Sequence, residues 1–137
     1  MTDQLDELHA QVFLAALASN TNLTDFDGKV PDPTPDPPWV LTYVTVSWPR
    51  DGIGTALTAQ QVTVTATATC HCVGLNAAAA RAVGMQVRSS LLNLKPVIAG
   101  RICSPVKQDD SQPPDRDEST GRLVMDQVQV FSFTSTG

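Results

Sequence analysis

The chain has 137 residues, 42% of them hydrophobic and 17% charged, with a formal net charge of −5 at pH 7. This length and composition are typical of one globular domain with its own core, so we expect a single domain over residues 1–137. The acidic balance argues against a protein that binds nucleic acid mainly through its phosphates.

The charges are unevenly distributed along the chain. Acidic residues outnumber basic ones in residues 1–36 and 107–137, whereas basic residues predominate in residues 37–106. Such asymmetry suits copies of one chain that meet through different surfaces. Scattered, solvated surface charge explains the same pattern.

Neither export nor membrane insertion is predicted. The first ten residues, MTDQLDELHA, are acidic where a signal peptide is basic, and no apolar run approaches the roughly 20 residues of a membrane span. Three cysteines, an odd number, favour reduced thiols over a disulfide framework. We therefore expect a protein that is made and used in solution, in a cytoplasm.

The N-terminal part predicts a helix followed by an extended arm. Apolar residues recur at steps of three or four over residues 3–18, which indicates an amphipathic helix. Five prolines within residues 26–39, FDGKVPDPTPDPPW, exclude a helix or a central strand there. This arm is either a stiff connector or a rim segment that contacts a neighbouring subunit.

Two strands joined by a turn come next. Residues 39–48 are rich in β-branched and aromatic side chains, and PRDGIG at residues 49–54 predicts a turn. Residues 61–72 alternate strictly between apolar and polar side chains. Alternation over this length predicts an antiparallel sheet with one face on a core.

A second helix is predicted from its capping residue, Asn76, to about Asn93. Arg81, Arg88 and Lys95 recur every seven residues, which aligns them along one side of this helix. The basic row is either solvated or in contact with an acidic neighbour.

The C-terminal part predicts two more strands with a loop between them. Residues 97–106 read as a strand, and residues 107–122, KQDDSQPPDRDESTGR, predict a long, mobile polar loop because they hold no apolar anchor. The last strand spans about residues 123–134. Its apolar phase changes at Val130 and Phe131, which favours a bulge or a change of packing partner there.

Together these elements predict an α+β fold. It consists of a mainly antiparallel four-stranded sheet, two helices packed on one face, and a long polar loop before the last strand.

The stretch Cys70-His71-Cys72 brings soft metal ligands close together in sequence. Because side chains alternate across a strand, Cys70 and Cys72 point to the core while His71 points the opposite way, so the three cannot bind one ion. Only His9 and Cys103 remain as further ligands of this kind. We therefore expect core thiols, and no catalytic site, cofactor or metal.

Three blocks, read together, resemble the tail terminator proteins of long-tailed phages with actinobacterial hosts. The blocks are FDGKVPDPTPDPPWVLTY, TATCHCVGLNAAAARAVGMQVRSSLLNL and GRICSPVKQDDSQPPDRDESTG, and a valine-rich strand follows them. The resemblance covers nearly the whole chain, and its motifs are structural rather than catalytic.

This resemblance implies a virion structural protein at the junction of tail and neck, assembled in the host cytoplasm. Such a subunit forms a ring, commonly hexameric, that caps the tail tube, stops polymerisation of the major tail tube protein and joins the tube to the head-tail connector protein. DNA would pass through the lumen without sequence-specific binding, and no membrane is involved.

We expect two surfaces of the chain to make the assembly contacts. In one hypothesis, the segment 107–122 meets the tube or lines the lumen and orders only on assembly. In the other, the basic row on the second helix pairs with the acidic N-terminal segment of the next subunit. The candidate interface residues are Arg81, Arg88, Lys95, Asp109, Asp110, Asp115, Arg116, Asp117 and Glu118.

Two alternatives come from other classes of protein. Another head-tail neck or completion protein would share the size, the acidity and the lack of catalytic motifs. A small metal-dependent or thiol-dependent enzyme would depend entirely on Cys70, His71, Cys72 and Cys103.

Overall fold

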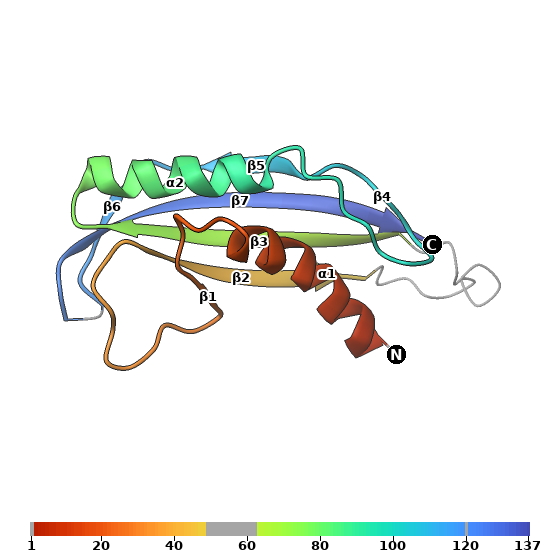
Figure 1. The fold of residues 1–137 in the computed structure, drawn as a ribbon, viewed down its shortest axis with the longest axis horizontal. Helices are drawn as coiled ribbons and strands as arrows, with labels where there is room; N and C mark the ends of the chain where they lie inside the picture. The colour runs from red at the N-terminus through yellow and green to blue at the C-terminus, as the bar shows by residue number, and fades with distance from the viewer. Residues whose placement is uncertain (1, 49–62, 120) are drawn as a thin grey trace.

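The computed structural model describes residues 2–48, 63–119 and 121–137 (Figure 1). The predicted turn at 49–54 and the first two residues of the strand predicted at 61–72 lie outside the described residues. The elements are, in chain order, α1 (Thr2–Ala18), β1 (Asp25–Asp27), β2 (Trp39–Ser47), β3 (Thr63–Gly74), α2 (Ala77–Leu91), β4 (Ile102–Cys103), β5 (Lys107–Ser111), β6 (Asp115–Asp117) and β7 (Val124–Thr136).

In the described residues, seven strands form one mixed sheet. β1 runs parallel to β2, and β2, β3 and β7 follow in antiparallel order. The three short strands β4, β5 and β6 pair in succession with β7 along its free side, so together they form one edge of the sheet (Figure 1).

The predicted four-stranded, mainly antiparallel sheet is therefore wrong. Residues 107–122, predicted as a mobile loop, contain β5 and β6, and only Ile102 and Cys103 of the segment 97–106 form a strand. These short segments carry little apolar pattern of their own. They become strands because β7, with 13 residues, offers backbone donors and acceptors along its whole free side.

The bulge predicted at Val130 and Phe131 is absent from the pairing of β7 with β3. The register between β3 and β7 runs without interruption from Thr63 opposite Thr136 to Gly74 opposite Met125. The apolar residues of β7 shift from one phase of the alternation to the other because apolar side chains lie on both faces of this strand. On the other side of β7, Phe131 pairs with Gln108 and Val130 with Asp110, so a register irregularity does lie at the predicted position, with the extra residue in β5.

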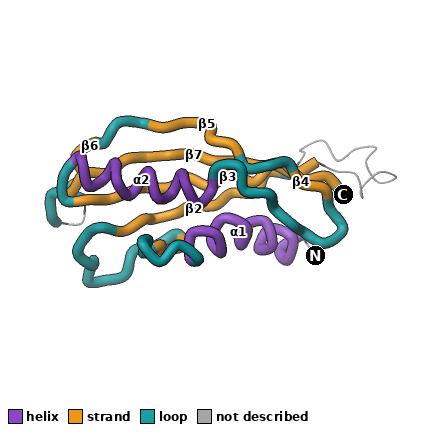
Figure 2. Tube along the Cα trace, turned by 45° about the horizontal axis from the view of Figure 1, so that its top comes forward, coloured by secondary structure: helices purple, strands orange, loops and turns teal. Residues whose placement is uncertain are grey.

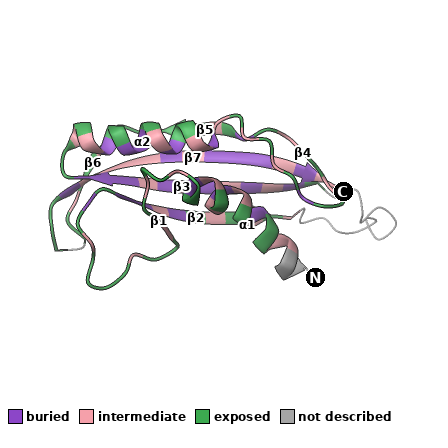
Figure 3. Cartoon of the chain, in the orientation of Figure 1, coloured by how far each residue is buried: buried purple, intermediate pink, exposed green. Residues whose placement is uncertain are grey.

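Both helices pack against the same face of the sheet (Figure 2). Alternate residues of β3 are fully buried on this face, from Val64 to Cys72. Phe13 of α1 and Val87 of α2 join them in one core with Phe131 of β7. Figure 3 shows the buried residues concentrated along β3 and β7, beneath α2.

The second helix begins as predicted but ends earlier. The side chain of Asn76 accepts a hydrogen bond from the Ala79 amide at 2.8 Å, which confirms its capping role. The helix ends at Leu91, and Asn93 adopts a left-handed conformation at φ 65°. Lys95 consequently lies beyond the helix.

The proline-rich arm covers one end of the opposite face of the sheet. Trp39, Val73 and Val124 form a small second cluster there, with Phe26 and Val30 packed against it. The Trp39 indole holds the middle of the proline-rich arm in place, because its Nε1 donates a hydrogen bond to the Pro35 carbonyl at 3.1 Å. The arm thus packs on its own subunit.

In the part of the chain that the structure describes, no helix combines the length and hydrophobicity that a membrane crossing requires.

Candidate functional site

Cys70 and Cys72 lie in the core, and His71 lies on the opposite face of β3, as predicted from alternation. Both thiols are fully buried beneath the helices. Burial raises the pKa of Cys70 to about 12 and raises the pKa of Cys72 as well. A reactive cysteine needs the reverse, a lowered pKa and access to solvent.

His71 faces three side chains from three other strands. Its Nδ1 lies 2.8 Å from Oδ2 of Asp126 in β7, and its ring meets the Tyr43 ring of β2 edge-on, with centroids 5.8 Å apart. The charge of Asp117 in β6 also acts on His71. These residues line a hollow of about 240 Å³ on the face away from the helices.

The electrostatics of this hollow favour a protonated imidazole. The hydrogen bond to Asp126 raises the pKa of His71 above 6.5, and the charges of Asp126 and Asp117 add to the effect while burial opposes it. Hydrogen bonds from Ser119 lower the pKa of Asp117. Among the described residues, no group of three or more His, Cys, Asp or Glu side chains is arranged to hold a metal ion.

The acidic residues predicted as an interface lie on β5, β6 and the turn after them, at one edge of the sheet. We call this the acidic edge, and its carboxylates are Asp109, Asp110, Asp115, Asp117 and Glu118. Lys107 pairs with Asp109 at 3.8 Å and Arg116 with Glu118 at 4.0 Å. These pairs are exposed and contribute little to stability, so the edge keeps its negative character.

The basic row predicted on the second helix is only partly present. Arg81 and Arg88 lie on the exposed side of α2 with Met85 between them, whose side chain is 71% exposed. Lys95 is exposed but lies beyond the helix end. We call Arg81, Met85 and Arg88, together with the half-buried Leu92 that follows the last residue of α2, the outer stripe of α2. The spacing of the three helical residues places them on one side, and Leu92 lines a hollow with Met85 and Arg88.

A groove lies along the edge of the sheet opposite the acidic edge. Among the described residues, no strand pairs with residues 43–47 of β2 on the side away from β3. A hollow of about 340 Å³ opens there, and we call it the β2-edge groove; its lining residues are Asp6, Glu7, Ala10, Asp27, Val44 and Val46. Trp48 Nε1 donates to Asp6 Oδ1 at 2.7 Å and holds the start of α1 against this edge.

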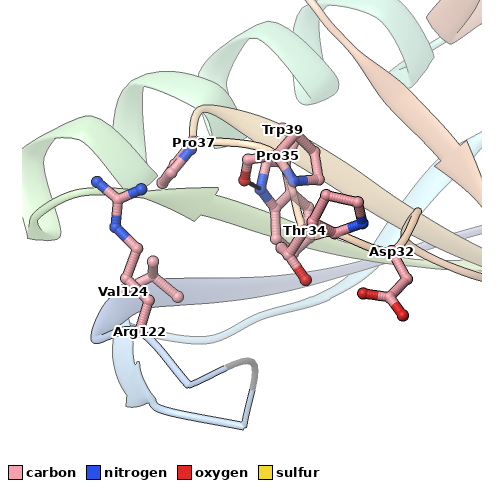
Figure 4. A pocket seen from close by; sticks show the side chains of 8 residues that line it. Asp32, Thr34, Pro35, Pro37, Trp39, Arg122 and Val124 are labelled. Carbon is pink, nitrogen blue, oxygen red and sulfur yellow. Dashed lines mark hydrogen bonds between the residues drawn. The ribbon is translucent and has the colours of Figure 1, made fainter.

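A further pocket lies between the proline-rich arm and the start of β7 (Figure 4). It measures about 310 Å³ and is lined by Pro35, Trp39 and Arg122 among others. Arg122 Nη1 donates to Asp36 Oδ1, so an ion pair fastens the arm to the turn before β7.

Sequence reasoning missed several of these residues. The sequence does carry a signal for Met85, because it lies four residues after Arg81 and three before Arg88 and so shares their side of a helix. Asp27 and the carboxylates of α1 come together only through the parallel pairing of β1 with β2. His9 is fully buried, with Nε2 and the Ser135 Oγ atom 2.6 Å apart. No sequence pattern predicted that contact.

No protein-family model matches the chain, and no curated protein matches it. A solved structure does share its fold. The matching chain belongs to a structure described as the virion of a native gene transfer agent particle. It aligns with a TM-score of 0.58 and 18% sequence identity, over 90% of this chain and 84% of the other. At this identity the likeness shows a common fold.

Proposed function

We propose that this chain is a structural protein of a virion, and more specifically a tail terminator. The observation that carries the proposal is the fold shared over 90% of the chain with a component of a gene transfer agent virion. The resemblance of its sequence blocks to tail terminator proteins supports the finer assignment.

In this role the subunits form a closed ring, commonly a hexamer, at the junction of tail and neck. The ring caps the tube, stops polymerisation of the major tail tube protein and presents a surface to the head-tail connector protein. A closed ring of like subunits requires two different contact surfaces on each copy. The outer stripe of α2 and the β2-edge groove supply such a pair of surfaces.

The acidic edge contacts the tube end or lines the lumen. Its five carboxylates come from two short strands and a turn, so the whole edge presents negative charge. Where it faces the lumen, it lets DNA pass without binding, because phosphates are repelled by carboxylates.

The role is non-catalytic and uses no cofactor or metal. The buried, protonated thiols at Cys70 and Cys72 support this part of the proposal against a thiol-dependent enzyme.

The test combines the purified chain with tail tubes assembled from the tube protein of the same phage. Negative-stain microscopy should show rings only at tube ends, and tube growth should stop when the chain is added. Tubes that keep elongating at the same rate, with bare ends, would reject the assignment.

The fold match also favours a second candidate, another head-tail neck or completion protein. That protein would bind the head connector without binding tube ends. The same microscopy, repeated with isolated connectors, separates the two roles.

A further inference from the structure

We infer that the outer stripe of α2 in one copy docks into the β2-edge groove of the next copy, and that this contact closes the ring. The inference rests on the proposed ring-forming function and names the surfaces that form it.

The outer stripe of α2 has the character of an interface. The inner side of the helix is buried on the sheet through Ala80, Val83 and Val87, so its outer side is the side left for a partner. Met85 is 71% exposed between Arg81 and Arg88, and neither arginine forms an ion pair within the described residues. Exposed Met and Arg are enriched where proteins bind one another.

The β2-edge groove is complementary to this stripe in charge and chemistry. Its described lining holds the carboxylates of Asp6, Glu7 and Asp27 and no basic side chain. Val44 and Val46 supply an apolar surface for the methionine. Arginine pairs well with carboxylates because its guanidinium donates from a planar fork.

The two arginines of the stripe lie far enough apart to make two separate charge contacts. Arg81 and Arg88 are seven residues apart, which corresponds to about 10 Å along a helix rising 1.5 Å per residue. Asp6 and Glu7 come from α1, whereas Asp27 comes from β1, so the carboxylates line the groove from two elements. A helix side seated in such a groove is a common mode of recognition.

Another candidate occupant for an open strand edge is the acidic edge of a second copy. Charge excludes it, because its carboxylates would face those of the groove. Asp109, Asp110 and Asp115 are all exposed there. Like charges placed opposite one another disfavour strand pairing.

The two proposed surfaces lie on different parts of the subunit. α2 lies over β3 and β7, whereas α1 lies beside β2 (Figure 2). The groove is lined by residues of α1, β1 and β2. The contact is therefore head-to-tail, and repetition of one such contact generates a ring when the rotation closes.

The experiment reverses charge on each surface and then on both. One variant carries Arg81→Glu with Arg88→Glu, the second carries Glu7→Lys with Asp27→Lys, and the third carries all four. The matched control, Lys95→Glu with Lys107→Glu, changes the net charge as much as the first variant does. All six side chains are exposed, so the fold is expected to persist. Circular dichroism checks this.

Mass is measured by sedimentation over concentrations up to the millimolar range, without tubes. We expect rings for the wild-type chain, the control and the four-residue variant. The two single-surface variants should fall to the 14.6 kDa of one chain. A monomeric wild type at millimolar concentration, intact rings in either single-surface variant, or no recovery in the four-residue variant overturns the inference.

The outcome is separable from that of the proposed function. Rings that respond to charge reversal as expected but never cap tubes leave the contact standing and reject the tail terminator role. If the chain caps tubes but its rings are unaffected by these charge reversals, the proposed contact is rejected and the tail terminator role is supported.

Discussion

Nδ1 of His71 lies 2.8 Å from Oδ2 of Asp126, and this pair joins β3 to β7 on the face of the sheet away from the helices. The other carboxylate oxygen of Asp126, Oδ1, is buried and has no hydrogen-bond partner among the described residues. Asp117 adds a second negative charge from β6. A protonated His71 is therefore stabilised in the folded state and links three strands.

This arrangement predicts a stability contribution that depends on pH. The hydrogen bond to Asp126 raises the folded-state pKa of His71 above 6.5, so the contribution is complete below 6.5 and is lost as pH rises through the higher folded-state pKa. His71→Gln should cost on the order of 1 kcal/mol at pH 5.5 and less at pH 8.5, measured by urea unfolding. In the Asp126→Asn background the His71→Gln cost should depend less on pH, because the largest cause of the raised pKa is gone while the charge of Asp117 and burial still act on His71; an unchanged dependence would contradict the pairing.

The partly buried carboxyl group of Asp25 predicts that the stability of the fold depends on pH, and that substitution of Asp25 removes this dependence. Burial raises the pKa of Asp25 from 3.8 to about 6. The hydrogen bond that the Thr42 hydroxyl donates to Asp25 opposes this rise, and the negative charge of Asp27 adds to it. Between pH 3.8 and about pH 6 the folded state therefore binds more protons than the unfolded state does. The wild-type chain consequently loses stability as pH rises through this range. Asp25→Asn should be more stable than wild type by about 1 kcal/mol at pH 8, because water screens the partly exposed carboxylate, and equal to it near pH 4.

The matched control for Asp25 is its neighbour on β1. Asp27→Asn should lower the pKa of Asp25, because it removes the repulsion, and NMR titration of the Asp25 carboxyl measures that directly. A titration midpoint of Asp25 near 4 in the wild-type chain would contradict the prediction.

The long strands and both helices were predictable because their own side chains carry the pattern. In β3 the alternation of fully buried and partly buried residues up to Cys72 matches a sheet with one face on a core. The short strands were not predictable in this way. β5 reads KQDDS and its burial shows no alternation, so its strand state comes from the free backbone groups of β7.

The candidate contact surfaces were predictable only in part, for two physical reasons. The periodicity of Arg81 and Arg88 identified the outer side of α2, but Asn93 turns left-handed and takes Lys95 out of the row. The β2-edge groove depends on a parallel pairing of three residues, Asp25–Asp27 against residues 40–42. A segment of three residues carries no periodicity to recognise.

The buried thiols predict a loss of stability without loss of a metal. Cys70→Ala and Cys72→Ala should each cost about 1–2 kcal/mol, because each leaves a small cavity in the core beneath the helices. Urea unfolding measures the cost, and elemental analysis measures the metal content. Cys103→Ala is the control, since Cys103 is half-buried and should cost less. Bound zinc that disappears in either core variant would contradict this reading.

Gly74 predicts an intolerance to any side chain at the end of β3. A Cβ atom there would lie 2.5 Å from the backbone nitrogen of Ala80 and 2.6 Å from the carbonyl carbon of Ala79. Gly74→Ala should therefore cost at least about 2 kcal/mol.

Gly84 in α2 provides the comparison for Gly74. Its Cβ would meet only the ends of the Gln127 and Gln129 side chains, and alanine favours a helix. Gly84→Ala should thus cost less than Gly74→Ala in the same unfolding experiment. Equal costs would mean that the close approach of β3 to the start of α2 is not what limits position 74.

The acidic edge predicts that tube capping can be lost while the fold is kept. Deletion of residues 109–118 is unsuitable for this test, because it removes most of β5 and all of β6 and leaves much of one side of β7 without a strand partner. Reversal of Asp109, Asp115 and Glu118 to lysine keeps both strands, since all three side chains are exposed. The triple variant should unfold within about 1 kcal/mol of wild type, because exposed charge pairs contribute little, and should keep its ring mass. In the microscopy experiment with tail tubes it should no longer stop tube growth. A triple variant that caps tubes as well as the wild-type chain would exclude the acidic edge from the contact with the tube.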